Sequence, residues 1–158
     1  MTKSLDDLPV AGFVAQEVDF SALFDRLSVN ARTTINDAVI TPAVDAERFP
    51  SSGQFCSVTV LGHSDRVDTP GLTSEQRRAQ ELGASLDRAK SAANWVWEQI
   101  TLGLTNAGVI PPATLPLAQN FDIAIAPCGA ADLIHTVPAG EAERAENRRV
   151  QFLVSSFT

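Results

Sequence analysis

Apolar residues recur along this chain at two spacings, one typical of strands and one typical of helices. Residues 13–20 alternate loosely between apolar and polar side chains, which predicts a first strand. Residues 55–61 predict the clearest strand, apolar on both faces as in a central strand that helices cover. Two shorter strands are expected over residues 122–126 and 149–155.

Helical spacing predicts a first helix after residue 28, carried by Ala31, Ile35, Ala38 and Val39. Ser28 or Asn30 is available as its N-cap. Pro42 is expected to end it, because the residue before a proline is pushed out of the helical region. A polar loop is then expected over residues 45–54.

A second, longer helix is expected from about Ser74, and Gly108 supplies a suitable C-terminal stop. Its apolar stripe consists of Ala79, Leu82, Leu86, Ala89, Ala93, Val96 and Ile100. Trp95 and Trp97 lie on different faces, so at least one is expected outside the main core.

The element order is β-α-β-α-β-loop-β, with an extended connector over residues 109–116 and a loop over 130–143 that has room for one helical turn. This order predicts an α/β two-layer sandwich, a mixed sheet with helices on one face. Residues 1–158 are expected to form one domain, with a core over 13–155 and an extended second helix and connector over 74–121.

Composition and charge narrow the function. A chain of 158 residues with 44% apolar residues can bury one sizeable core. The net charge of −7 argues against a nucleic-acid binder that uses a general positive field. No stretch approaches the ~20 apolar residues that cross a bilayer, so no membrane insertion is expected. The first residues lack the apolar segment of a signal peptide and carry Asp6 and Asp7 instead.

The two cysteines are expected to be free thiols. Cys56 opens one predicted strand and Cys128 closes another. If those strands are parallel, the two sulfur atoms lie at opposite ends of the sheet, too far apart for a disulfide.

Three polar stretches carry the candidate chemistry. Residues 58–65 form an apolar strand that ends in a carboxylate, residues 75–80 open the long helix with two arginines, and residues 144–150 form a basic run before the last strand. An acid at a strand end and arginines at a helix start suit a ligand that carries both an ammonium and a carboxylate.

These stretches resemble the OmpA-like peptidoglycan-binding domain family, which includes the OmpA C-terminal, Pal and MotB-like domains. Residues 62–65 read Gly-His-Ser-Asp, and residues 77–80 read Arg-Arg-Ala-Gln. Residues 123–129 match the family's short strand before a glycine, and residues 143–150 match its closing Gly-Arg-x-x-Asn-Arg-Arg-Val except at the first position. The resemblance spans residues 13–155.

The departures from the family pattern fall near the expected site. The loop over residues 65–78 is shorter than is usual, and the family's glycine is replaced around Asp68. Its asparagine before the helix is missing, with Gly-Leu-Thr at residues 71–73. The helix from Ser74 is also longer, with an insertion between residues 92 and 121.

The resemblance implies that Asp65 accepts hydrogen bonds from the ammonium of the stem-peptide diamino acid, and that Arg78 clamps its carboxylate. Arg77 is the alternative to Arg78 in register. The alternative roles are that Asp65 caps a turn or pairs with Arg148, and that Arg78 is only a solvated helix residue.

Three more residues are ligand-binding candidates near the closing motif. Arg148 is expected to stand behind Asp65, and Arg144 to line the pocket. Asn147 is expected to stabilise the turn more than to touch the ligand.

No enzyme, cofactor or metal site is expected. His63 and Asp65 share one side of a strand, and Cys128 and His135 could form a thiol–imidazole pair. However, the chain has no serine elbow, His-Glu-x-x-His or Cys-x-x-Cys motif, and its histidines and cysteines do not match a zinc spacing.

The sequence therefore predicts non-covalent peptidoglycan binding that anchors or docks an assembly at the bacterial cell wall, in a periplasm-facing part of the envelope. The alternative is a structural subunit of a phage or contractile-injection-type particle that keeps the fold with lost or altered ligand binding. The lack of a signal peptide, the shortened loop and the extended helix favour the alternative, since a particle could carry the chain to the wall.

Overall fold

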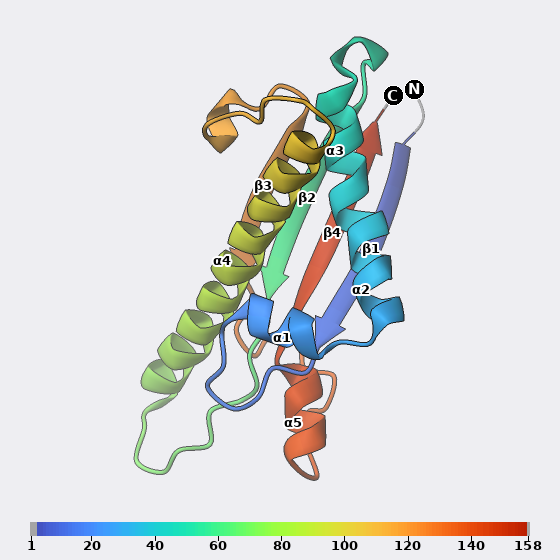
Figure 1. The fold of residues 1–158 in the computed structure, drawn as a ribbon. Helices are drawn as coiled ribbons and strands as arrows, with labels where there is room; N and C mark the ends of the chain where they lie inside the picture. Colours follow the sequence, from blue (N-terminus) through green and yellow to red (C-terminus); the bar gives the residue numbers. More distant parts are fainter. Residues whose placement is uncertain (1–2, 158) are drawn as a thin grey trace.

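The computed structural model describes residues 3–157, whose strands form one four-stranded sheet (Figure 1). The strands are β1 (Lys3–Ala11), β2 (Phe55–Gly62), β3 (Phe121–Pro127) and β4 (Arg149–Phe157), in the spatial order β1-β4-β2-β3. β4 is antiparallel to both β1 and β2, and β2 is parallel to β3. The sheet is therefore mixed, as the sequence predicts.

All but one of the described helices cover one face of the sheet. The helices are α1 (Phe20–Arg26), α2 (Val29–Ile35), a π-helical segment (Asn36–Ile40), α3 (Thr41–Arg48), α4 (Ser74–Asn106) and α5 (Glu141–Asn147). Single 3-10 turns occur at Pro50–Ser52 and Leu115–Leu117. Figure 1 shows α1 to α4 on one face, while α5 lies at the end of the sheet where β2 terminates. The predicted two-layer sandwich is confirmed.

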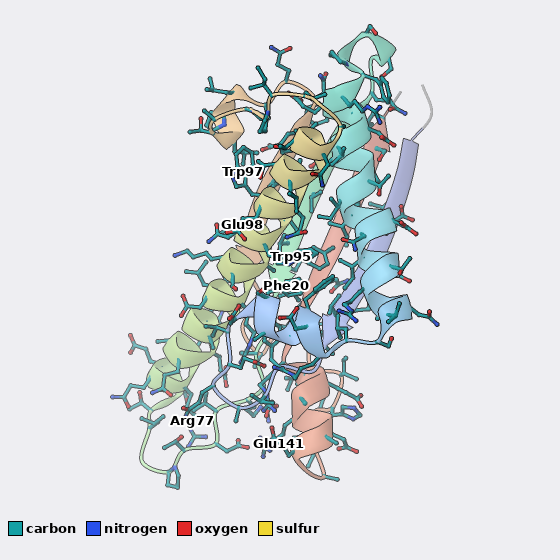
Figure 2. All side chains as sticks on the ribbon, in the orientation of Figure 1. Phe20, Arg77, Trp95, Trp97, Glu98 and Glu141 are labelled. Atoms are coloured by element: carbon teal, nitrogen blue, oxygen red, sulfur yellow. The ribbon has the colours of Figure 1, made fainter. Side chains whose placement is uncertain are left out.

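Alternation along the central strands sets the core. Val58 and Val60 of β2 are fully buried toward the helices, whereas Ser57 and Thr59, which alternate with them, stay partly exposed. β2 is a central strand, as expected, but helices cover only one of its faces. Opposite β2, the core holds Phe20 against Trp95, with ring centroids 5.1 Å apart (Figure 2).

The predicted first strand over residues 13–20 is wrong. The chain turns at Gly12, which has φ of +112°, and the acidic side chain of Asp19 caps α1. Phe13 and Phe20 are buried in the aromatic core rather than in a strand. The true first strand, β1, contains two acids and Pro9, which only an edge strand tolerates because one side of it faces solvent.

Pro42 does not end a helix, which corrects a second prediction. Ser28 caps α2 as expected, accepting a hydrogen bond from the Ala31 amide at 3.2 Å. A π-turn then shifts the bonding pattern, because the Thr41 amide donates to the Asn36 carbonyl. Pro42 thus falls in the first turn of α3, where a missing N–H costs little. The loop expected over residues 45–54 is therefore partly wrong, because α3 continues to Arg48.

The long helix is confirmed. Thr73 and Gln76 form a capping box at its start, and Gly108 follows its end with φ of +76°. Trp95 is buried in the core, whereas Trp97 lies outside it against Phe121 at the β3 edge. Within residues 3–157 no helix, α4 included, combines the length and the apolar character that a bilayer crossing requires.

Both cysteines are free, as predicted. Cys56 pairs in register with Phe121 at one end of the parallel β2–β3 pair, and Cys128 follows the other end. Burial raises the pKa of the Cys56 thiol to about 11, so it remains protonated at neutral pH.

Candidate functional site

The end of β2 is fixed tightly between its neighbours. A Cβ atom at Gly62 would stand 1.8 Å from the Ser85 carbonyl oxygen, so only glycine lets α4 approach the strand here. Beyond it, the His63 amide donates to the Arg149 carbonyl at 2.9 Å. This extended pairing delivers Asp65 to the rim of a cleft between α4 and α5.

Asp65 is held from two sides. Arg144 Nη1 donates to Asp65 Oδ2 at 2.8 Å, and Asn147 Nδ2 donates to Oδ1 at 2.9 Å. The Asp65 side chain is only 8% exposed. Burial acts to raise the pKa of Asp65, but the hydrogen bonds from Asn147 and Arg144 outweigh it, so this pKa lies below its ordinary value. Asp65 is therefore ionised and internally paired at neutral pH.

Arg144 bridges two carboxylates. Its second amino group, Nη2, donates to Asp68 Oδ2 at 3.0 Å. Arg144 is one-third exposed and Asp68 is more than half exposed, so this pair forms the open side of the cleft. Arg144 therefore lines the cleft, and its contact with a ligand stays a prediction.

Asn147 lies beneath the cleft, fully buried. Its Oδ1 accepts from the His135 amide at 2.9 Å, and its Nδ2 donates to the His135 carbonyl at 2.8 Å as well as to Asp65. The His135 ring bonds Glu146 Oε2 at 2.7 Å, which raises the pKa of His135. Asn147 thus ties Asp65 to the loop before α5, the stabilising role expected of it.

The cleft has a volume of about 440 Å³ and a balanced set of charges. Four carboxylates line it, from Asp65, Asp68, Glu81 and Glu141. Four guanidinium groups line it too, from Arg66, Arg88, Arg144 and Arg148. Ser64 also borders the cleft, and its buried Oγ has no hydrogen-bond partner among the described residues. Figure 2 shows Glu141 of α5 and Arg77 of α4 at this same end of the molecule.

Arg148 does not stand behind Asp65, contrary to the sequence-based expectation. Its Nε donates to the Phe13 carbonyl at 2.8 Å, and its Nη2 pairs with Glu141. The Arg148 side chain extends instead toward Phe13, just after the end of β1. Arg144, one helical turn earlier, lies beside Asp65. Arg149 faces the other way and pairs with Asp132 at 2.8 Å.

The structure does not bring Arg78 into the cleft with Asp65. Arg78 is exposed and lines a separate hollow of about 100 Å³ beside Cys128 and Gly129. Glu81 borders both hollows, whereas Arg78 lines only the smaller of the two and Asp65 only the larger. Arg77, the register alternative, is half-buried and lines neither.

Arg88 is a cleft residue that the sequence reading missed. It is 2% exposed, donates to the His63 carbonyl at 3.1 Å and to the Glu17 carbonyl at 3.0 Å, and stacks on Phe13. Burial lowers the pKa of Arg88 to about 10. The sequence feature that could have indicated its burial is its position directly before Ala89, which belongs to the apolar stripe of the helix.

The residues considered for catalysis are not brought together. His63 is 2% exposed, and burial lowers its pKa, so its ring is neutral and packed inside. His135 bonds Glu146 rather than Cys128. Among residues 3–157 no cluster of three metal-ligating side chains occurs.

No family model matches the sequence, and no curated protein matches it. Solved structures that are similar include the cell wall anchor of the T6SS from Pseudomonas aeruginosa, at 17% identity and a TM-score of 0.45, covering 98% of this chain and 82% of that one. The OmpA-like domain of FopA1 from Francisella tularensis subsp. tularensis SCHU S4 has 14% identity and a TM-score of 0.45, with 97% and 73% covered. The peptidoglycan-associated lipoprotein from Burkholderia pseudomallei has 18% identity and a TM-score of 0.40, with 92% and 88% covered. These likenesses are distant in sequence and geometry, so the proposal below rests on the residues of the cleft.

Proposed function

We propose that the cleft binds peptidoglycan non-covalently, through the diamino acid of its stem peptide, and so anchors or docks this chain at the bacterial cell wall. The observation that carries the proposal is the balanced charge of the cleft, with four carboxylates facing four guanidinium groups. Because Asp65, Asp68 and Glu141 already pair with Arg144 and Arg148, a ligand of one charge sign could replace only one partner of each pair that it breaks. A zwitterionic end, with an ammonium beside a carboxylate, complements both sets.

The ammonium would bind between Asp65 and Asp68. Arg144 now occupies that position, bonded to both carboxylates. Binding therefore requires Arg144 to release Asp65, and the exposed Asp68 offers the released guanidinium a partner. Because this exchange replaces one charge-assisted pair with another, the net affinity should be weak, roughly micromolar to millimolar for one site. Repeated sites on the polymer would raise the avidity.

The carboxylate would bind an arginine on the open side of the cleft. Arg66 is exposed, lines the cleft and makes no ion pair with any other residue in the range 3–157. Arg78, which the resemblance implies for this role, lines the neighbouring hollow instead. The two candidates can be separated by Arg66→Ala and Arg78→Ala, and the one that clamps the carboxylate should lose about tenfold in affinity.

The deciding experiment is co-sedimentation of the folded chain with purified insoluble peptidoglycan at low salt. We expect pelleting that free diaminopimelic acid competes away. Asp68→Asn should weaken it about tenfold, while Asp87→Asn, an exposed acid on α4 outside the cleft, should not. A folded chain that stays in the supernatant would overturn the proposal.

The second candidate function is a structural subunit of a phage or contractile-injection-type particle with lost or altered ligand binding. One observation favours it: both carboxylate oxygens of Asp65 already accept a hydrogen bond, from Arg144 and from Asn147, and the side chain is only 8% exposed. This candidate predicts no pelleting with the wall and instead concentration-dependent assembly, which sedimentation velocity of the chain alone would detect.

A further inference from the structure

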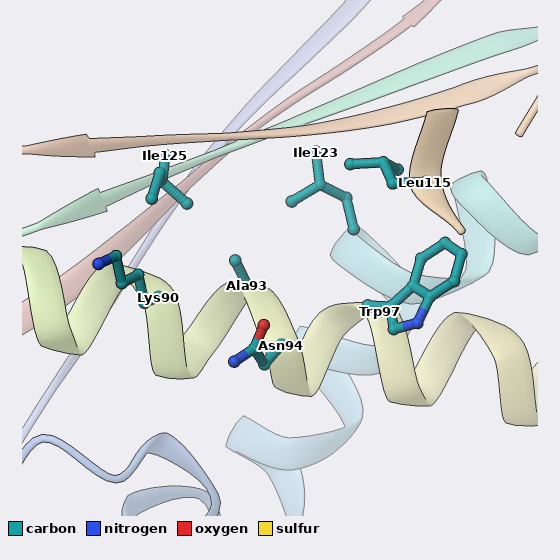
Figure 3. A pocket seen from close by; sticks show the side chains of 7 residues that line it. All are labelled: Lys90, Ala93, Asn94, Trp97, Leu115, Ile123 and Ile125. Atoms are coloured by element: carbon teal, nitrogen blue, oxygen red, sulfur yellow. The ribbon is translucent and has the colours of Figure 1, made fainter. Parts of the chain in front are cut away.

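A third hollow lies at the edge of the core, between α4 and the edge strand β3 (Figure 3). Its volume is about 300 Å³, near the lower end of small-ligand sites. Ala93, Trp97, Leu115, Ile123 and Ile125 give it an apolar lining. Lys90 and Asn94 are its polar residues. It shares no residue with the cleft around Asp65.

The shape follows from residue size along one face of α4. Lys90, Ala93 and Trp97 follow at steps of three and four, so Lys90 and Trp97 lie about 10 Å apart along the axis. Ala93 between them leaves the floor low beneath Ile123. Trp97 forms a fixed end wall because it packs on Phe121, with ring centroids 5.9 Å apart. Figure 3 shows Lys90 under Ile125 at one end and Trp97 near Leu115 at the other.

The two ends of the hollow differ in chemistry. The Lys90 side chain is exposed and makes no ion pair or hydrogen bond within the described part of the chain, although it also borders a neighbouring hollow lined by Asp19, Asp87 and Glu98. Ile125 remains 40% exposed, although its side chain faces the hollow. The surface therefore combines an uncovered apolar wall with one unpaired cation at its end.

The strand edge itself is poorly suited to another strand. Cys56 and Cys128 donate their amides across the β2–β3 pair, to Asn120 and Gly62, so the odd-numbered residues of β3 point their amides outward. Of these, the Ile123 amide is already bonded to Asp122 Oδ1 at 2.8 Å, and Pro127 has no N–H. An extended peptide, or β3 of a second copy, would find its ladder interrupted.

We propose that this hollow binds an amphiphile with an unbranched apolar chain and a terminal carboxylate, the chemistry of a medium-length fatty acid. The chain lies along α4 over Ala93, with its far end against Trp97. The carboxylate pairs with Lys90, whose charge it complements. This site is independent of wall binding at the cleft.

Octanoate and octan-1-ol are suitable probes, because they share a chain and differ in charge. Titrated into the full chain, octanoate should give a saturable change in tryptophan fluorescence that Trp97→Phe removes, since Trp95 is buried in the core. Lys90→Gln should weaken octanoate about tenfold and octanol less than twofold. Arg78→Gln, a cation on the same helix outside the hollow, is the matched control and should change neither.

Ala93→Leu fills the floor and should abolish binding of both probes, with an unchanged melting temperature showing that the variant folds. If Ala93→Leu unfolds, the test depends on the surface variant Lys90→Gln alone. The proposal is overturned if octanoate does not saturate, if Lys90→Gln weakens both probes equally, or if Ala93→Leu instead dissociates a dimer seen by sedimentation.

Discussion

The end of β2 and the first turn of α4 face the same end of the molecule, but they hold their charged side chains in opposite ways. Asp65 is 8% exposed and bonded by Arg144 and Asn147. Arg78 is exposed, and no ion pair to it occurs among residues 3–157. The charge of Asp65 is thus part of the folded structure, whereas the charge of Arg78 is not.

The difference gives Asp65 a structural role in addition to the binding role proposed for it. A buried carboxylate with two donors contributes to stability even when no ligand is present. Asp65 is therefore expected to affect folding as well as binding, in contrast to an open-site residue, which affects binding alone. The variants below test this contrast, beginning with the largest expected effect.

Asn147→Ala should have the largest effect. Asn147 is fully buried and joins Asp65 to both backbone groups of His135, so its removal leaves several buried polar atoms without partners. We expect a loss of about 3 kcal/mol in the free energy of unfolding, measured by urea denaturation. A loss below about 1 kcal/mol would mean that water replaces these bonds.

Asp65→Ala should cost about 2 kcal/mol in the free energy of unfolding. The cost is smaller than for Asn147 because Arg144, at one-third exposure, can turn to Asp68 and to water. Asp68→Ala serves as the control, since this carboxylate is 54% exposed and should change stability little. Equal losses for the two acids would break the contrast between a structural and an open carboxylate.

Acid should remove the contribution of Asp65. Its pKa in the folded chain lies below the ordinary carboxyl value, so its ionised form stabilises the fold above about pH 4. As the pH falls through the folded-state pKa, that contribution is lost. The stability difference between the parent and Asp65→Asn should therefore shrink from neutral pH toward pH 2, as followed by urea denaturation at several pH values. A difference independent of pH would show that ionisation is not involved.

Arg78→Ala should have the smallest effect, within about 0.5 kcal/mol in the free energy of unfolding. Thermal melts of this variant and the parent should coincide. Any wall-binding loss in this variant would then report ligand contact alone. Destabilisation of 1 kcal/mol or more would place Arg78 in the fold rather than on its surface.

Most of the fold could be predicted because its central elements have uniform patterns. β2, β3, β4 and α4 carry continuous apolar or helical periodicity, and their bounds agree with the sequence-based ranges within a few residues. β1 could not be predicted from alternating apolar and polar residues, because it contains two acids and Pro9. It is a strand because it pairs with β4. The chain stays helical on both sides of Pro42 because a π-turn precedes it, and a π-turn has no recognisable sequence pattern.

The candidate site was predictable where the closing motif determines it, and less so where loop length does. Asp65, Arg144 and Asn147 meet because α5 and the end of β2 converge on one edge. The position of Arg78 depends on how the short loop sets the rotation of α4, which residue types alone do not give. Arg88 was missed because an arginine is ordinarily assigned to the surface, whereas here two backbone carbonyls satisfy it.

The close contact at Gly62 determines which parts of the cleft can move. Because the Ser85 carbonyl oxygen would be 1.8 Å from any Cβ there, α4 and the end of β2 are packed too closely for a side chain to enter between them. The opposite wall is α5, a helix of seven residues entered through a loop. Adaptation to a new ligand, by evolution or by directed mutagenesis, is therefore expected along the exposed loop of residues 66–73 rather than at the strand end or at the buried Asp65 and Asn147.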